Sequence, residues 1–296
     1  SVYPLISRLF TGDEITVARP FYDQVNGPLF LCLLFLMGVG PLLPWRRTTA
    51  AGVGKALLRP GSFALAVVVV LLALGLRQPY ALIAFGLGAL VTAGILLEWY
   101  RGARSRHRSM GENYVWAWLR LIGANRPRYG GYIVHLAVVM VALGIVGASF
   151  FGTQRDVVLA PGDSFTIEDY ELIYTGTVEV PHSNRTEFVS TVEVYRDGRQ
   201  LDTLYPRRDF YPAFNMAATR AAIRSTPVED LYVVPSENLA DGKVGFRFLV
   251  NPLMWWMWVA GPVMVLGTLV ALWPQPSSVR ATVAARVPAG SRASPA

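Results

Sequence analysis

The chain has 296 residues, of which 53% are hydrophobic and 16% are charged, and its mean hydropathy is +0.37. This composition is typical of a membrane-embedded protein. The net charge of +7 would suit a nucleic-acid-binding protein, but the basic residues are confined to segments between apolar runs, which excludes nucleic acid as the expected partner.

Five runs without charged residues are candidates for membrane-spanning helices, since about 20 apolar residues cross the hydrocarbon layer. They are residues 24–45, 62–76, 78–97, 129–154 and 248–279. The run 62–76 is the shortest, and it can span the membrane if Arg59 and Arg77 extend to opposite interfaces.

The charges between the runs predict the orientation. Residues 46–60, 100–130 and 274–296 carry four, seven and three basic residues against a single acid, whereas residues 1–27 and 152–250 are more acidic than basic. Cytoplasmic loops of membrane proteins carry the excess of Lys and Arg. The first three segments are therefore expected inside and the other two outside, which fits five spans without exception.

These patterns predict an α-helical polytopic membrane protein of about five transmembrane helices, with an inserted β-rich extracytoplasmic domain. The expected order is an outer-face segment (1–27), transmembrane helices 1–3 (28–100), a cytoplasmic loop with an amphipathic helix (101–128), transmembrane helix 4 (129–151), a periplasmic β-rich domain (152–250), transmembrane helix 5 (252–273) and a disordered cytoplasmic tail (274–296). The amphipathic helix is predicted from apolar residues at i, i+3, i+4 and i+7, namely Val115, Trp118, Leu119 and Ile122.

The segment 152–250 alternates polar with β-branched or aromatic residues, which is typical of strands. Asp197-Gly198 and Asp241-Gly242 are expected to form turns between strands, and a short helix is expected near Met216 to Arg224.

His135 is the polar residue that needs an explanation, because it lies within the apolar run 129–154. It follows Tyr129 by six residues, which places it about 9 Å into the helix. An imidazole at that depth needs a partner. Three are open: a hydrogen bond to a neighbouring helix, a proton pathway, or a metal such as haem iron bound through Nε2. Gly130 and Gly131 would allow a backbone or a flat ligand to approach closely.

The remaining candidates have simpler interpretations. His107 lies in an arginine-rich loop and His182 in a loop between strands, so both are expected to be solvated. Trp255, Trp256 and Trp258 are expected in the aromatic belt at the membrane interface. The single Cys32 cannot form an intramolecular disulfide, and the sequence has no Walker loop, GxSxG, HExxH or CxxC motif. We therefore predict no catalytic residue in this chain.

Several stretches resemble the CcmF-type cytochrome c haem lyases, in the same order and up to about Pro274. They are YPLISRLFTGDEITVARPFYDQ, GVGPLLPW, RYGGYIVHL, RDVVLAPGDSFTIEDYELIYTG, RDGRQLDTLYPRRDFY and EDLYVV. The resemblance implies a C-terminal portion of such a lyase in the bacterial inner membrane, with the β domain in the periplasm. Members of this family help to attach haem covalently to the CxxCH motif of apocytochrome c, and they hold a b-type haem inside the membrane.

The resemblance also implies a cofactor and partners. His135 matches one of the family's two transmembrane haem ligands, so its expected role is axial ligand to the iron of haem b. The expected partners are the N-terminal half of the lyase, a haem chaperone, apocytochrome c with its thiol-reducing partner, and membrane lipid, with quinol as a candidate electron donor.

The chain departs from the family pattern because the second transmembrane histidine and the Trp-rich haem-handling segment belong to the N-terminal portion. The chain is thus expected to supply at most one axial ligand and to be inactive as a lyase by itself, as a split subunit or a truncated chain. Many members carry Gly where this chain has Ala137. The alternative is a non-catalytic scaffold whose β domain docks the haem chaperone or apocytochrome c.

Overall fold

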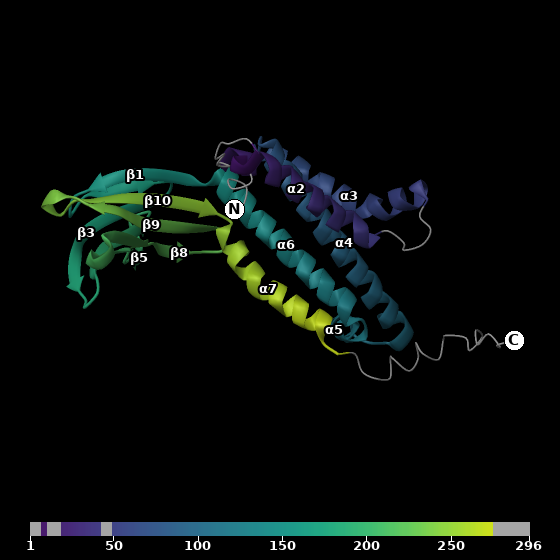
Figure 1. Ribbon diagram of the computed structural model, residues 1–296. Helices are drawn as coiled ribbons and strands as arrows, with labels where there is room; N and C mark the ends of the chain where they lie inside the picture. The colour runs from purple at the N-terminus through teal and green to yellow at the C-terminus, as the bar shows by residue number, and fades with distance from the viewer. Residues whose placement is uncertain (1–6, 11–18, 43–48, 275–296) are drawn as a thin grey trace. The chain divides into compact units, whose positions relative to one another are not determined.

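The structure is a computed structural model that describes residues 7–10, 19–42 and 49–274 (Figure 1). The helices are α2 (Arg19–Val39), α3 (Ala50–Ala73), α4 (Pro79–Met110), α5 (Tyr114–Ala124), α6 (Arg126–Phe151) and α7 (Met254–Leu272), with short 3-10 turns η1 (Gly40–Leu42), η2 (Pro212–Phe214) and η3 (Ala240–Gly242). The strands are β1 (Thr153–Leu159), β2 (Ser164–Ile167), β3 (Tyr170–Pro181), β4 (Thr186–Arg196), β5 (Arg199–Leu204), β6 (Arg207–Tyr211), β7 (Met216–Arg220), β8 (Ala222–Ser225), β9 (Glu229–Asn238) and β10 (Val244–Pro252).

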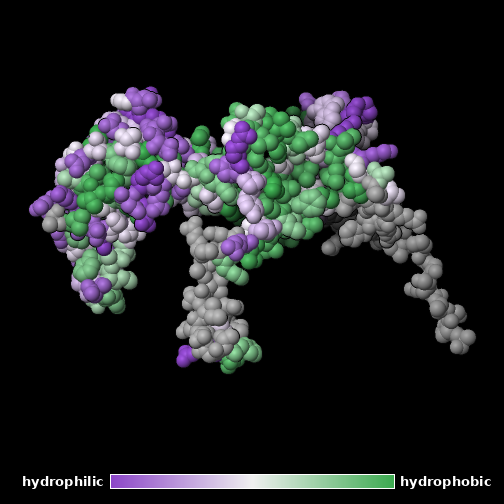
Figure 2. All heavy atoms as spheres, turned by 90° about the horizontal axis from the view of Figure 1, so that it is seen from above, coloured by the Kyte–Doolittle hydropathy of each residue, from purple (hydrophilic) through white to green (hydrophobic). Residues whose placement is uncertain are grey.

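The expected fold class is confirmed. Within the described residues, five helical segments are long and apolar enough to cross a membrane: Gln24–Leu42, Ala51–Ala73, Pro79–Met110, Arg126–Phe151 and Met254–Leu272. Hydrophobic residues gather over these helices, and hydrophilic residues dominate the visible surface of the β domain (Figure 2). All strands fall between α6 and α7 in the chain, as the change from helical to alternating periodicity indicated.

The chain divides into two compact units. One contains the described residues up to Ala64, residues 89–138 and residues 261–274, and the other contains residues 65–88 and 139–260. The boundaries fall inside α3, α4, α6 and α7, so each of these helices contributes one part to each unit.

Two helices extend ten or more residues beyond the charge-free runs that indicated them. Helix α3 extends from Ala50 to Ala73, about 36 Å at 1.5 Å per residue, so Arg59 lies within the helix instead of at its end. Helix α4 continues to Met110, through residues 101–110 that were expected to form a loop. Arginine favours helices even where hydropathy falls. Helix α4 stops where Gly111 adopts φ 68°, the left-handed conformation that commonly ends a helix.

An aromatic cluster joins α4, α5 and α6 in the first unit. The ring of Trp99 lies 4.7 Å from that of Trp118, 5.6 Å from Tyr129 and 6.5 Å from Tyr132, measured between ring centroids. Gly102 makes this approach possible, because an added Cβ would lie 2.9 Å from Leu121 Cδ1. Helix α5 therefore packs against the ends of α4 and α6 through one face.

Glycines bring the backbones of α6 and α7 into contact. A Cβ added at Gly130 would lie 2.5 Å from the Ala271 nitrogen and 2.7 Å from the Gly267 oxygen. A Cβ added at Gly267 would lie 2.9 Å from the Val134 nitrogen. Small residues at such crossings are a general way to pack helices in lipid, where the gain comes from close van der Waals contact.

The β domain is a sandwich of two antiparallel sheets. One has the order β1-β10-β9-β8, and the other has the order β2-β3-β4-β6-β7 with β5 also paired to β4. Residues of β3, β4, β9 and β10 supply most of the core between the sheets, as expected for sheets with one buried face. The buried core residues are Leu159, Ile167, Tyr170, Leu172, Tyr174, Val192, Val194, Leu204, Leu231, Val233, Val244, Phe246, Phe248 and Val250.

Both expected turns are present. Asp197 and Gly198 connect β4 to β5 with φ values of 53° and 71°, and Asp241 and Gly242 lie between β9 and β10 with φ values of 60° and 72°. The prediction of a short helix near Met216 to Arg224 is wrong, because these residues form β7 and β8. The alanine-rich sequence favours a helix, but pairing of β7 with β6 and of β8 with β9 overrides that local preference.

In the second unit, three hydrogen bonds attach the start of α7 to the β8–β9 turn and to the start of β9. The backbone N–H of Leu253 donates to the Val228 carbonyl (2.8 Å), and the indole N–H of Trp256 donates to the Pro227 carbonyl (3.0 Å). The indole N–H of Trp258 donates to Asp230 Oδ2 (3.3 Å). Burial raises the pKa of the Asp230 carboxyl. Two of the tryptophans expected in the aromatic belt thus also position α7.

The α6–α7 contact generates a stability prediction. Gly130→Ala should destabilise the protein, because an overpacking cost of about 1–3 kcal/mol against main-chain atoms exceeds the gain of about 1 kcal/mol in helix propensity. Gly131→Ala is the matched control, since an added Cβ there meets no atom within 4 Å. The check is the thermal unfolding midpoint of the detergent-purified chain. A midpoint for Gly130→Ala equal to or above that of Gly131→Ala would contradict the packing described.

Candidate functional site in helix α6

His135 lies in the middle of a membrane-spanning candidate. Helix α6 begins at Arg126, three residues earlier than the apolar run, so His135 lies about 14 Å from its first residue. Its side chain is half-buried. His135 is therefore further from the start of its helix than the apolar run suggested.

A hydrogen bond within α6 determines the tautomer of His135. Its Nδ1 lies 2.6 Å from the carbonyl oxygen of Gly131, one helical turn earlier. A carbonyl oxygen can only accept, so Nδ1 carries the hydrogen, and in the neutral ring Nε2 then keeps its lone pair. Within the described residues no other group hydrogen-bonds to this ring, so the hydrogen bond to a neighbouring helix, one of the three open interpretations, is not formed there. Histidine ligands of metals typically have this arrangement, in which the second nitrogen fixes the ring.

The two glycines before His135 have different surroundings. Gly130 faces the backbone of α7, whereas an added Cβ at Gly131 would meet no atom within 4 Å. Gly131 and His135 are four residues apart and so lie on the same face of the helix. Of the two uses considered for these glycines, Gly130 serves helix packing and Gly131 leaves open space beside the imidazole.

A polar network lies one to two turns before His135 in α6. Arg128 Nε donates to the Tyr132 hydroxyl (2.9 Å), and Arg128 Nη2 pairs with Glu98 Oε2 of α4 (2.5 Å). Arg101 pairs with the other oxygen of Glu98 (3.2 Å). These contacts hold α6 against α4 and fix the helix that carries His135.

The other two histidines have partners outside this site. His107 Nδ1 lies 2.7 Å from the Glu112 carbonyl oxygen, and its ring stacks on Tyr114 at 4.3 Å. His182 Nε2 lies 2.9 Å from Glu187 Oε2. Both were expected to be solvated loop residues, but each stabilises a local connection between elements.

Sequence reasoning missed an ionic cluster on the β4–β6–β7 sheet. Glu187 and Asp209 are directly paired residues of β4 and β6, and Arg220 of β7 binds both carboxylates, at 3.0 Å and 2.8 Å. Hydrogen bonds from His182 and then Arg207 lower the pKa of Glu187. Strand register alone brings these charges together, and no local sequence pattern indicates that register.

The donor set of the site is a single histidine nitrogen. Within the described residues there is no group of three or more His, Cys, Asp or Glu side chains that could hold a metal ion. His135 offers one imidazole nitrogen, with open space at Gly131. One such nitrogen suits an axial ligand of a haem, whose other bonds to iron come from the porphyrin.

Comparison with known proteins gives the family. A family model described as the CcmF C-terminal beta-sandwich matches residues 150–252, which include all the strands. Among curated proteins, the chain is 30% identical over 273 residues to the cytochrome c-type biogenesis protein CycK of Rhizobium meliloti (strain 1021). It is 31% identical over 276 residues to the cytochrome c-type biogenesis protein CcmF of Pseudomonas fluorescens. Each match covers 92% of this chain and 40% of the relative.

A solved structure titled "Cytochrome c Heme Lyase CcmF" has the same fold, with a TM-score of 0.73 and 29% identity. The match covers 92% of this chain and 42% of that one. The chain corresponds to the C-terminal portion of CcmF-type proteins. It spans about two fifths of the length of the two curated relatives. His135 lies outside the CcmF beta-sandwich match, in the helix that precedes it.

Proposed function

We propose that this chain is part of a membrane-bound cytochrome c haem lyase, and that His135 Nε2 is one of two axial ligands of a b-type haem. The observation that carries the proposal is the Nδ1 hydrogen bond to Gly131, which leaves Nε2 with a lone pair inside a membrane-spanning helix. The open space at Gly131 on the same helix face supports it. The names of the relatives, which concern cytochrome c biogenesis and haem lyase, agree with it.

Each residue of the site has a defined part in this proposal. His135 binds and orients the iron, Gly131 leaves room for the edge of a flat ligand, and the apolar residues of α6 exclude water. When bound, the haem would supply electrons to the haem that is being attached to apocytochrome c, with quinol as the proposed donor. The second axial ligand would come from the N-terminal portion of the lyase, so we expect no lyase activity from this chain alone.

The proposed topology places the β-sandwich in the periplasm and the C-terminus in the cytoplasm of a bacterial inner membrane. The charge distribution supports this orientation, since residues 46–60 and 100–130 are rich in arginine or lysine. On the periplasmic side the β-sandwich could contact the haem chaperone, apocytochrome c and its thiol-reducing partner.

A second function, a scaffold without haem, has one observation in its favour. The hydrogen bond to Gly131 satisfies one nitrogen of His135 without any ligand, so a half-buried imidazole in this helix does not by itself require a metal. In that case the β-sandwich would dock partners, and loss of His135 would leave the haem content of the complex unchanged.

His135→Ala discriminates between these functions when the chain is produced together with the N-terminal portion. We expect the b-type absorption band of the reduced, purified complex to fall to background, since His107, at the polar end of α4, is already bound to the Glu112 carbonyl and cannot replace the ligand. His182→Ala is the matched control, because it removes a histidine from the β-sandwich and should leave the band intact. An unchanged band in His135→Ala favours the scaffold.

Gly131→Leu tests the open space separately from the ligand. An added Cβ at Gly131 meets no atom within 4 Å, and the thermal unfolding midpoint of Gly131→Leu checks that the longer side chain leaves the chain folded. If the edge of a haem occupies that space, the leucine should reduce the haem content severalfold while Gly131→Ala reduces it less. Full haem content in Gly131→Leu would show that the cofactor does not lie on this face.

A further inference from the structure

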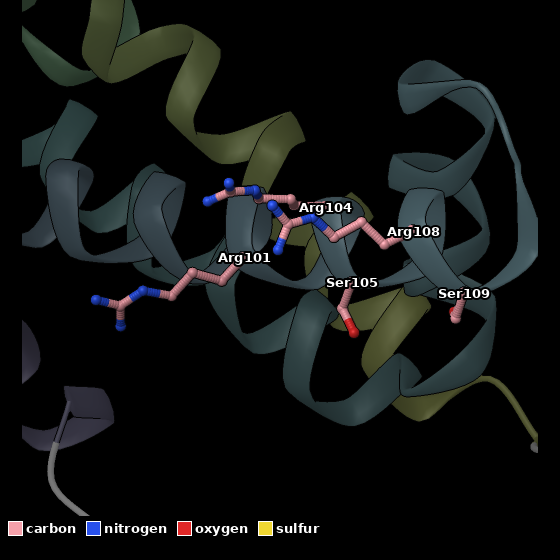
Figure 3. Close-up of a pocket in the computed structure, with 5 residues that line it drawn as sticks. All are labelled: Arg101, Arg104, Ser105, Arg108 and Ser109. Carbon is pink, nitrogen blue, oxygen red and sulfur yellow. The ribbon is translucent and has the colours of Figure 1, made fainter.

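Five side chains line a hollow of about 470 Å³ at the C-terminal end of α4: Arg101, Arg104, Ser105, Arg108 and Ser109 (Figure 3). Residues three or four apart share one helix face, and this set follows that spacing along two turns. The arginine side chains extend from α4 toward the same side of the view in Figure 3. The hollow is therefore lined by guanidinium groups and hydroxyls, which are all hydrogen-bond donors.

The charges on this face are only partly balanced. Arg101 pairs with Glu98 at 3.2 Å. Arg106, on the neighbouring face, pairs with Glu112 at 3.1 Å, and Arg120 of α5 binds the same carboxylate at 2.5 Å.

Arg104 and Arg108 differ from these residues. Over the part of the chain that the structure describes, neither has a carboxylate within ion-pair distance, and both are exposed. Two unneutralised guanidinium groups one turn apart form a site for an anion, and arginine binds phosphate oxygens in a bidentate manner.

The length of α4 indicates which anion reaches this face. From Pro79 to Arg101 the helix rises about 33 Å, close to the hydrocarbon thickness of about 30 Å. Arg104 and Arg108 lie about 5–10 Å further along the helix, at the depth of the lipid headgroups. The phosphate groups of the membrane itself are thus the anions at this level.

The surface of helix α5 also indicates that the end of α4 lies at the depth of the lipid headgroups. Its Val115, Trp116 and Leu119 side chains are exposed although they are apolar. A short helix with such a surface is typical of one that lies in the membrane interface. Helix α5 is joined to the end of α4 through Glu112, so both elements belong at the headgroup level.

We propose that this face of α4 binds the headgroup phosphate of an anionic phospholipid, through Arg104 and Arg108 with a hydroxyl donor from Ser105. The Ser109 hydroxyl donates to the Arg106 carbonyl and borders the site. Arg101 borders the site and keeps its ion pair with Glu98. The site is independent of the haem, so its failure would leave the proposed function untouched.

The test is native mass spectrometry of the detergent-purified full chain titrated with phosphatidylglycerol, with phosphatidylcholine as the lipid without net charge. Two basic residues near the membrane surface together raise the affinity for an anionic lipid about thirtyfold. R104Q/R108Q should therefore bind phosphatidylglycerol about thirtyfold more weakly than the unaltered chain. R104K/R108K should fall between the two, because lysine keeps the charge and loses the bidentate geometry.

K55Q/R59Q is the matched control. Lys55 and Arg59 are also exposed basic residues four apart on a helix, α3, and they do not line the hollow. This variant should bind phosphatidylglycerol with nearly unchanged affinity. A thermal unfolding midpoint measured for each variant confirms that the chains are folded.

Three results would overturn the proposal. The first is an equal loss of binding in R104Q/R108Q and K55Q/R59Q, which would indicate diffuse attraction to the net charge. The second is equal affinity for the two lipids. The third is inorganic phosphate, at an ionic strength held constant with chloride, binding in the absence of lipid and displacing phosphatidylglycerol, which would assign the site to a soluble anion.

Discussion

The hydrocarbon layer offers no water to a polar group, and this constraint determines how α6 carries His135. Every N–H and lone pair in that layer needs a partner from the protein or from a ligand. The Gly131 carbonyl accepts a hydrogen bond from Nδ1. Among the described residues, Nε2 is then the ring nitrogen without a hydrogen-bond partner. A helix that is otherwise apolar thus presents one nitrogen lone pair with a defined direction. A metal-centred cofactor would satisfy that lone pair, in agreement with the proposed role in haem binding.

The residues around His135 have different roles in packing. Gly130 brings α6 onto the backbone of α7, and Tyr132 and Arg128 hold it against α4, so the helix has little freedom to rotate. Gly131 keeps the remaining face open. A ligand held by a single protein nitrogen needs such a fixed helix, because a small rotation of α6 would turn the imidazole away from the ligand. At the end of α4, the ion pairs of Glu112 likewise hold α5 in place, and they leave the arginine-lined face free.

The sequence was sufficient for features that depend on local composition. Charge-free runs indicated five membrane helices, alternation indicated the β-rich domain, and Asp197-Gly198 indicated a hairpin turn. It failed where pairing overrides local preference, as for the helix expected near Met216 to Arg224, which forms β7 and β8. It also underestimated the lengths of α3 and α4. Hydropathy indicates which residues can lie in the hydrocarbon layer, whereas a helix can continue beyond that layer.

For the site, the sequence identified His135, but the tautomer and the different roles of Gly130 and Gly131 required the structure. The central claim is that His135 Nε2 binds haem iron, and chemical rescue tests it most directly. His135→Gly, prepared with the N-terminal portion, should lose the low-spin spectrum of a bis-histidine b-type haem and regain it when imidazole is added, because the small ligand occupies the place of the missing ring. The account is contradicted if His135→Gly keeps the spectrum without imidazole.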